Sequence, residues 1–136
     1  MLENKRIIIT GAGSGIGRAT SKLAAGYGAQ IVCVDLTDGV EETVAEITQA
    51  GGTAIAVQAD VSDETSVINF VEKCVSEYGG IDGIYANAGV SGGGKSVTEL
   101  TVEDWQRTLG VNTIGVFLAV KHTVPHFVKQ GSRAFN

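Results

Sequence analysis

Short apolar runs alternate along the chain with longer segments in which apolar residues recur every three or four positions. The short runs predict buried strands at residues 7–9, 31–34, 53–59 and 81–86. The longer segments predict helices at residues 14–27, 38–50, 62–78 and 101–129. The strands are continuously apolar rather than alternating, which indicates a parallel sheet covered on both faces. Right-handed crossovers then favour an α/β fold with a doubly wound parallel sheet in the order 3-2-1-4.

Several helix starts carry capping residues. The predicted caps are Asp38 with Glu41, Ser62, and Thr101 with Asp104. Along the first helix Ile16, Ala19, Leu23 and Tyr27 fall on one face, the pattern of an amphipathic helix. The last helix is apolar on two sides, which predicts that it packs against two neighbours, and Pro125 is expected to kink it.

Composition and charge narrow the possible functions. The 136 residues, 43% of them hydrophobic, predict a single domain with a real core. The net charge is −5 and no basic run extends beyond Lys5–Arg6, so nucleic acid and anionic membranes are poor partners. No apolar stretch reaches the ~20 residues of a membrane span, and no signal peptide is expected. Cys33 and Cys74 sit in apolar patterns and are expected to be reduced thiols of a cytoplasmic protein.

A glycine-rich turn, residues 10–17, joins the first strand to the first helix. Its spacing, Gly-x3-Gly-x-Gly, differs from the common Gly-x-Gly-x2-Gly, and no Lys-Ser/Thr follows it as in a Walker loop. Such a turn exposes backbone N–H groups and a helix N-terminus to a pyrophosphate. We assign Gly11 to the tight turn, Gly15 to the approach of the phosphate, and Gly17 to helix–sheet packing. Ser14 and Ile16 lie between them, and the alternative is a tight turn without a ligand.

Asp35 ends the second strand, 18 residues after Gly17. A carboxylate at this point can accept both hydroxyls of an adenosine ribose and repels a 2′-phosphate, which predicts NAD as the cofactor. Leu36 follows it and Ser14 is not basic, so Arg18 is the one cation near enough to question that preference. The alternative is a solvated carboxylate at a strand end.

Together with Asp60-Val61, Asn87-Ala88-Gly89 and Val111-Asn112, the turn resembles the motifs of the short-chain dehydrogenase/reductase family over residues 5 to about 130. The resemblance implies a Rossmann-like fold. It implies that Asp60 meets the adenine amino group, with Val61 beside it, and that Asn87, Ala88 and Gly89 stabilise the sheet and line the adenosine site. It further implies that Asn112 is a catalytic residue whose main-chain carbonyl holds a water. Alternatively, Asp60 precedes a helix cap, Asn87 ties strand ends together, and Asn112 is a buried polar residue that bends its helix.

The family's remaining catalytic residues are missing from the sequence. No tyrosine of the chain forms Tyr-x3-Lys, and residues 133–136 lack the apolar run of a fifth strand, which suggests truncation after about four strands. We therefore expect the cofactor half of an enzyme that exchanges hydride between NAD(H) and a small-molecule secondary alcohol or ketone, inactive alone. The alternatives are a non-catalytic NAD-binding module and a non-functional fragment. An unprotected edge at 81–86 beside the apolar last helix predicts a homo-oligomer. His122 and His126 lack a third ligand, so no metal site is expected.

Overall fold

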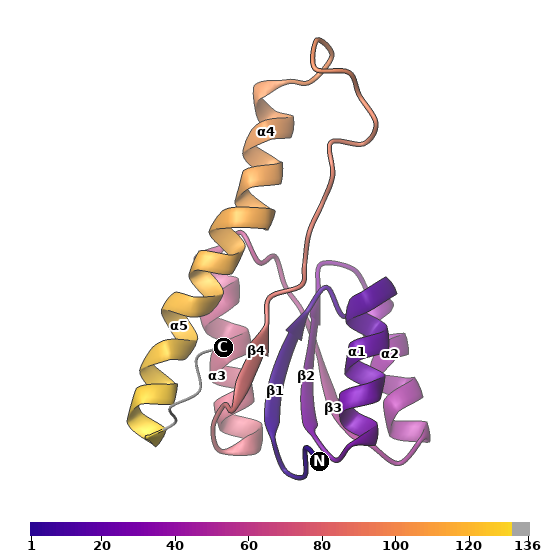
Figure 1. Cartoon of the computed structure of the whole chain (residues 1–136), viewed down its shortest axis with the longest axis vertical. Helices are drawn as coiled ribbons and strands as arrows, with labels where there is room; N and C mark the ends of the chain where they lie inside the picture. Colours follow the sequence, from indigo (N-terminus) through magenta and orange to yellow (C-terminus); the bar gives the residue numbers. More distant parts are fainter. Residues whose placement is uncertain (132–136) are drawn as a thin grey trace.

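The computed structural model describes residues 1–131 (Figure 1). Strands and helices alternate along the chain as far as the fourth strand. The strands are β1 (Arg6–Thr10), β2 (Gln30–Asp35), β3 (Thr53–Gln58) and β4 (Gly83–Tyr85). The helices are α1 (Gly15–Gly26), α2 (Gly39–Gln49), α3 (Glu64–Tyr78), α4 (Val102–Leu109) and α5 (Gly115–Gln130). A π-helical turn, η1 (Gly110–Ile114), joins α4 to α5. Residues 133–136, where the sequence lacks the apolar run of a fifth strand, lie outside the described residues.

The four strands form one parallel sheet in the order β3-β2-β1-β4, which confirms the predicted topology. In the central pair Ile8 lies opposite Val32 and Thr10 opposite Val34. All strands therefore end at the same edge of the sheet, where the loops that follow them meet.

Helices cover both faces of the sheet and create two apolar cores. One core, centred on Phe70 of α3, includes residues of α5, and the other packs α1 and α2 against β1 and β2. Cys74 lies in the first core and Cys33 in the second, both as free thiols. Burial raises the pKa of Cys33 to about 11 and that of Cys74 to about 12, so both thiols stay protonated.

Helix α1 corrects the predicted amphipathic face. Ile16 and Leu23 are 70% and 62% exposed, whereas the buried residues of α1 are Gly17, Ser21, Ala24 and Ala25. The helix lies so close to the loop after β1 that only small residues fit between them. An apolar stripe therefore identified the wrong side of α1.

Two of the predicted helix caps are wrong and one is confirmed. Asp38 has helical backbone angles and makes no side-chain capping bond. Asp63, not Ser62, caps α3 by accepting a hydrogen bond from the backbone N–H of Ser66 at 2.8 Å. Thr101 and Asp104 form a full capping box at the start of α4.

The last strand, β4, is shorter than predicted, with three residues instead of six. Gln130 of α5 takes the place of a strand partner for Ile81. Its amide accepts from the Ile81 N–H at 2.9 Å and donates to the Ile81 carbonyl at 2.7 Å. Next to it, Arg6 of β1 donates two side-chain hydrogen bonds to Asp82 at 2.7 and 2.9 Å. These side chains hold residues 81 and 82 in place of further strand pairing.

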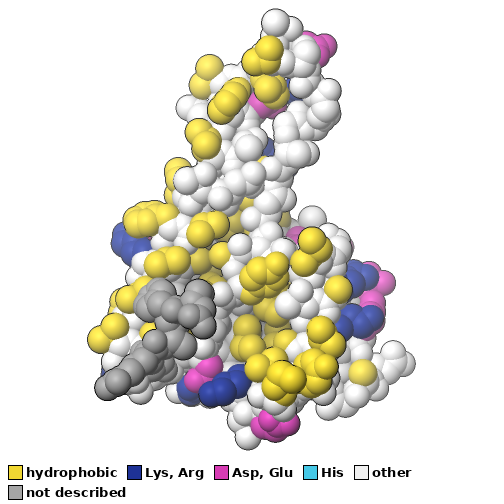
Figure 2. Space-filling model, in the orientation of Figure 1, with side chains coloured by type: hydrophobic (Ala, Val, Ile, Leu, Met, Phe, Trp, Pro, Cys, Tyr) yellow, Lys and Arg dark blue, Asp and Glu magenta, His cyan; other side chains and the backbone are white. Residues whose placement is uncertain are grey.

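Helices α4, η1 and α5 form one continuous helical segment that extends beyond the sheet (Figure 1). The segment continues through Pro125 to Gln130. Leu118, Ala119 and Phe127 are buried against the sheet layer, but much of the segment is not. The exposed apolar residues of α4, η1 and α5 include Trp105, Leu109, Ile114, Val116, Phe117 and Val120, which together are called the "helix patch" below. Figure 2 shows apolar side chains along this projecting part. Among the described residues, no helix has the length and apolar character needed to cross a bilayer.

Candidate functional site

A pocket of about 440 Å³ opens where the four strands end. The predicted cofactor residues that line it are Gly11, Ser14, Gly15, Ile16, Asp35, Asp60, Val61, Asn87, Ala88 and Gly89. They come from the loops after all four strands, so residues far apart in the sequence share one wall. The exceptions among the predicted site residues are Gly17 and Asn112, which do not line the pocket.

The glycine-rich loop needs its glycines for three different reasons. Gly11 and Gly15 have left-handed backbone angles, with φ of +68° and +51°, which L side chains rarely adopt. At Gly15 a Cβ would meet nothing within 4 Å, so this residue borders open space. At Gly17 a Cβ would lie 2.0 Å from the carbonyl oxygen of Gly11. Gly17 is therefore absent from the pocket wall because it packs against the back of the loop.

The N-terminus of α1 faces the pocket without a protein cap. Ser14, the N-cap residue, makes no side-chain capping bond, and the first turn of α1 carries no acidic residue. By contrast, α3 and α4 are capped by Asp63 and Thr101. The free N–H groups of a helix N-terminus favour an anion.

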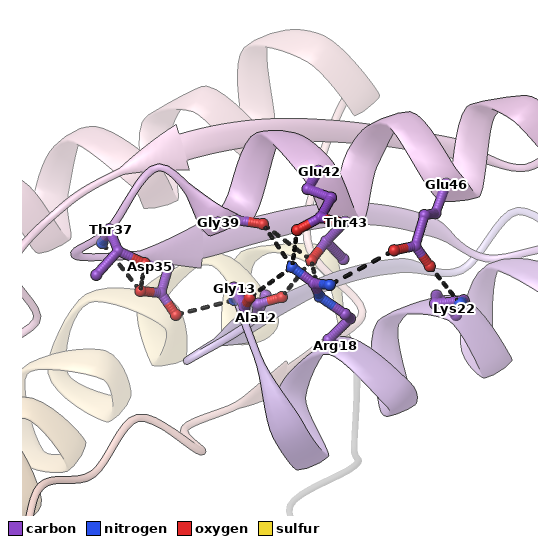
Figure 3. A network of polar contacts seen from close by, with 10 residues as sticks. All are labelled: Ala12, Gly13, Arg18, Lys22, Asp35, Thr37, Gly39, Glu42, Thr43 and Glu46. Carbon is purple, nitrogen blue, oxygen red and sulfur yellow. Dashed lines mark hydrogen bonds and ion pairs between the residues drawn. The ribbon is translucent and has the colours of Figure 1, made fainter.

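Asp35 points its carboxylate between the loop and the end of β2 (Figure 3). Its Oδ2 accepts a hydrogen bond from the N–H of Gly13 at 2.9 Å. Its Oδ1 accepts from both the N–H and the hydroxyl of Thr37, each at 2.9 Å. A carboxylate offers about four acceptor sites, so about one remains, on Oδ2.

Arg18, the cation that could have challenged a preference for NAD, is turned away from the pocket. Its guanidinium donates to the carbonyl of Gly13 at 2.9 Å and to Glu42 at 2.7 Å, and it also contacts Glu46 (Figure 3). The hydrogen bond from Arg18 to Glu42 raises the pKa of Arg18. Arg18 is therefore committed to α2 rather than to a ligand.

Asp60 uses one of its oxygens within the chain. Its Oδ1 accepts from the N–H and the hydroxyl of Ser62 at 2.9 and 2.6 Å. Within residues 1–131 no donor reaches Oδ2 of Asp60. That oxygen can accept from a ligand in the pocket.

Asn87 and Ala88 connect the ends of β4 and β1. The Asn87 side chain donates to the Thr10 carbonyl at 3.1 Å, and the Ala88 N–H donates to the Thr10 hydroxyl at 3.0 Å. Both residues also line the pocket. Tying strand ends together, the simpler interpretation of Asn87, is therefore compatible with its position at the site.

Asn112 lies in the π-helical turn η1 and is bonded to a single residue. Its side chain accepts from the Val90 N–H and donates to the Val90 carbonyl, both at 2.8 Å. Asn112 is exposed, so the alternative of a buried polar residue is wrong. The two bonds attach the helical segment to the loop that follows β4.

The sequence reasoning missed several residues of the pocket wall, namely Leu36, Thr37, Ala59, Val90, Arg107 and Val111. Except for Arg107, each lies within two positions of a predicted site residue along the chain. Closeness in sequence alone could therefore have identified them. Arg107 lies one helical turn before Val111, and only the path of α4 brings it to the pocket.

The two histidines of α5 do not form a metal site with other side chains. His122 lies 2.8 Å from Glu64 of α3, which also binds Lys121. Among the described residues there is no group of three or more His, Cys, Asp or Glu side chains that could hold a metal ion. The geometry at His122 is that of an ion-pair cluster on the surface.

Comparison with known proteins identifies the class of protein that this fold and pocket define. Residues 5–134 match the short chain dehydrogenase family, and the chain belongs to that family. Cis-4-hydroxycyclohexanecarboxylate dehydrogenase from Sinomonas cyclohexanicum is 37% identical, over 93% of this chain and 51% of that protein. The structure of a short chain dehydrogenase/reductase from Burkholderia phymatum in complex with NAD is similar with a TM-score of 0.91 and 33% identity, over 95% of this chain and 46% of that one.

A further solved structure is similar over nearly all of the chain. The 3-ketoacyl-(acyl-carrier-protein) reductase from Brucella melitensis, complexed with NADH, gives a TM-score of 0.90 and 38% identity, over 98% of this chain and 54% of that one. The chain thus spans about half the length of the curated relatives that it matches.

Proposed function

We propose that this chain is a single nucleotide-binding domain that holds NAD in the pocket at the strand ends. The observation that carries the proposal is the convergence, in one pocket, of an uncapped helix N-terminus, a loop glycine with open space beside it, and a strand-end carboxylate with a free acceptor site. The helix N-terminus suits a pyrophosphate, and the open space beside the glycine lets that pyrophosphate approach the backbone. The carboxylate suits a ribose hydroxyl.

The residues present fit the adenosine half of the cofactor. The N–H groups at the start of α1, beside Gly15, would hold the pyrophosphate. Asp35 would accept from one ribose hydroxyl with its remaining acceptor site, and the free oxygen of Asp60 would accept from the adenine amino group. Ala88 and Val111 supply apolar wall on the other side. When bound, the nicotinamide supplies hydride chemistry, which no side chain of this chain can supply.

We further propose that the chain is the cofactor half of an oxidoreductase that acts on a secondary alcohol or ketone. The family, and relatives such as the hydroxycyclohexanecarboxylate dehydrogenase, support this reaction class. The resemblance of Val111-Asn112 to the family's motif makes Asn112 the candidate catalytic residue, and Asn112 lies in the π turn next to Val111 of the pocket wall. Removing a hydroxyl proton needs a positioned base, and the sequence has no Tyr-x3-Lys. We therefore expect the 136 residues alone to produce no NADH from cyclohexanol or other secondary alcohols.

Thermal unfolding with and without NAD tests the binding proposal. At a ligand concentration of one hundred times Kd, binding stabilises the folded state by about 2.7 kcal/mol. For a domain of this size the gain corresponds to a rise in Tm of roughly 5 to 10 °C. An unchanged Tm at millimolar NAD refutes NAD binding. The alternative function, an NAD-binding module without catalysis, predicts the same rise in Tm. It predicts no turnover when the C-terminal half of a relative is added.

Asp35→Ser separates NAD from NADP as the preferred cofactor. In the unmodified chain we expect NADP to raise Tm less than NAD, because its 2′-phosphate meets the Asp35 carboxylate. Replacing the carboxylate with a hydroxyl should narrow the difference between the two ligands. A preference that the substitution leaves unchanged shows that Asp35 does not select the cofactor.

A further inference from the structure

The loop residue Gly13 is held from two sides, and the two contacts join a charged network to the pocket. Its N–H donates to Asp35 at 2.9 Å, while its carbonyl accepts from Arg18 at 2.9 Å (Figure 3). A Cβ at Gly13 would lie 2.8 Å from Cγ of Asp35, so the two residues are in direct contact. The N–H belongs to the Ala12–Gly13 peptide group and the carbonyl to the next one, so Asp35 and Arg18 hold two successive peptide groups that meet at the Cα of Gly13. A rotation about Gly13 would therefore change the hydrogen bond to Asp35.

Residues of α2 fix the other side of the loop. Thr43, which is fully buried, donates from its hydroxyl to the Ala12 carbonyl at 2.8 Å and accepts from Nε of Arg18 at 3.1 Å. Arg18 also donates to the Gly39 carbonyl at 3.3 Å. Arg18 thus bridges the loop and the first turns of α2.

The charges of this network balance. Arg18 pairs with Glu42 and Glu46, and Lys22 pairs with Glu46, so two cations face two carboxylates. The Glu42 side chain is 67% exposed, and exposed pairs of this kind add little to stability. The ion pair with Glu42 therefore matters more for where it holds the guanidinium than for the free energy of folding.

We propose that Arg18 is a positioning residue of the nucleotide pocket: it holds the Gly13 carbonyl directly and the Ala12–Gly13 peptide group through Thr43, so that Asp35 presents its free acceptor site to the ribose 2′-hydroxyl. The inference rests on the proposed function. The remaining acceptor site of Asp35 is on Oδ2, the same oxygen that Gly13 holds. Arg18 thereby supports recognition of an unphosphorylated ribose without touching the ligand, and Glu42 and Glu46 keep its charge from a 2′-phosphate.

Calorimetric titration with ADP and 2′-deoxyADP tests this role, because the two ligands differ only in the hydroxyl that Asp35 would bind. Arg18→Met should weaken ADP binding about threefold to tenfold, the size of an indirect hydrogen-bond coupling. Binding of 2′-deoxyADP should change by less than about twofold. Lys22→Met is the matched control, since it removes a cation that pairs with Glu46 from the same helix without contacting Gly13. It should leave both affinities unchanged.

A double-mutant cycle with Asp35→Ala adds a second readout. If Arg18 acts through Asp35, Arg18→Met should weaken ADP binding by less than about twofold when Asp35 is already alanine. Arg18→Lys, which keeps the charge and can still reach the Gly13 carbonyl, should recover part of the ADP affinity. If Arg18→Met does not fold, Glu42→Gln replaces it in the comparison, with an expected selective loss of about twofold.

Three results would overturn the inference alone: equal weakening of both ligands, additive losses in the cycle, or a gain in NADP affinity on Glu42→Gln. The last would show that Arg18 is itself a phosphate ligand once its partner is removed. An unmodified chain that binds neither ADP nor NAD would instead refute the proposed function, and the role of Arg18 with it.

Discussion

Gly17→Ala tests the packing that places the glycine-rich loop on α1. A Cβ at residue 17 would lie 2.0 Å from the carbonyl oxygen of Gly11 and 2.6 Å from its carbonyl carbon. Real Cβ atoms keep about 3.0 Å or more from such neighbours, so α1 and the loop must separate by roughly 1 Å. Overpacking of this kind costs about 1 to 3 kcal/mol. The methyl group would also push the Asn87 side chain, 2.8 Å from the same point, off its bond to Thr10.

Gly26→Ala is the matched control for that experiment. Gly26 lies in the same helix, and a Cβ there would meet nothing within 4 Å. Because alanine favours a helix over glycine, Gly26→Ala should be neutral or stabilise the fold by up to about 1 kcal/mol. Urea unfolding of both variants measures the free energies, and titration with NAD measures the affinities. Equal stability of Gly17→Ala and the unmodified chain would refute the packing argument, and undiminished NAD binding would show that the loop geometry is not needed for the ligand.

Three further predictions concern an ion pair at the start of the sheet, a hydrogen bond beside the pocket and the helix patch. Hydrogen bonding by Arg6 lowers the pKa of Asp82, so this contribution to stability is present above the unfolded-state pKa of about 3.9 and is lost as pH falls through the lower folded value. Asp82→Asn should cost about 1 to 3 kcal/mol at pH 7 and flatten the acid limb in urea unfolding between pH 4 and 2, whereas an unchanged limb contradicts the assignment. Asn112→Leu should speed hydrogen exchange of the Val90 amide, measured by NMR, and unchanged exchange would contradict this hydrogen bond. The helix patch should cause self-association in sedimentation velocity, and a monomer across a tenfold concentration range contradicts this.

The order of the sheet could be predicted because it depends on patterns within the chain. Continuous apolar strands at regular spacing specify a parallel sheet, and the handedness of the crossovers leaves few possible orders. The length of β4 could not be predicted in the same way. Ile81 is apolar and β-branched like a strand residue, yet its backbone groups bond to Gln130, 49 positions away. Nothing in the local sequence marks that amide as a partner.

Two of the capping bonds could not be predicted for a related reason. Ser62 and Asp63 are both good capping residues, and the extended backbone that precedes α3 falls on Asp63, while the Ser62 hydroxyl donates to Asp60. Asp38 also has the right chemistry, but its backbone is already helical. A capping residue identifies the region where a helix begins, and competition among neighbouring oxygens decides the position.

The sequence predicted those parts of the candidate site in which the backbone conformation requires a particular residue type. Gly11 and Gly15 are needed for their φ values and Gly17 for contact with the loop, and each need leaves a glycine in the sequence. A strand-end carboxylate such as Asp35 is equally visible. The orientation of that carboxylate is not, because it depends on Gly13, which Arg18 holds from α1 with the help of α2.

If the proposed function holds, the two sides of the glycine-rich loop meet opposite demands. The side toward the ligand must stay open, as it does at Gly15, and the other must be filled and hydrogen bonded, as it is at Gly17 and around Arg18. The open side is made of backbone, so its glycines can be recognised directly in the sequence. The filled side is made of long side chains that reach across from neighbouring helices, and their pairing is settled only when α1 and α2 pack together. The proposed role of Arg18 therefore predicts that selectivity for a ligand can be altered from behind the loop, by residues that no motif contains.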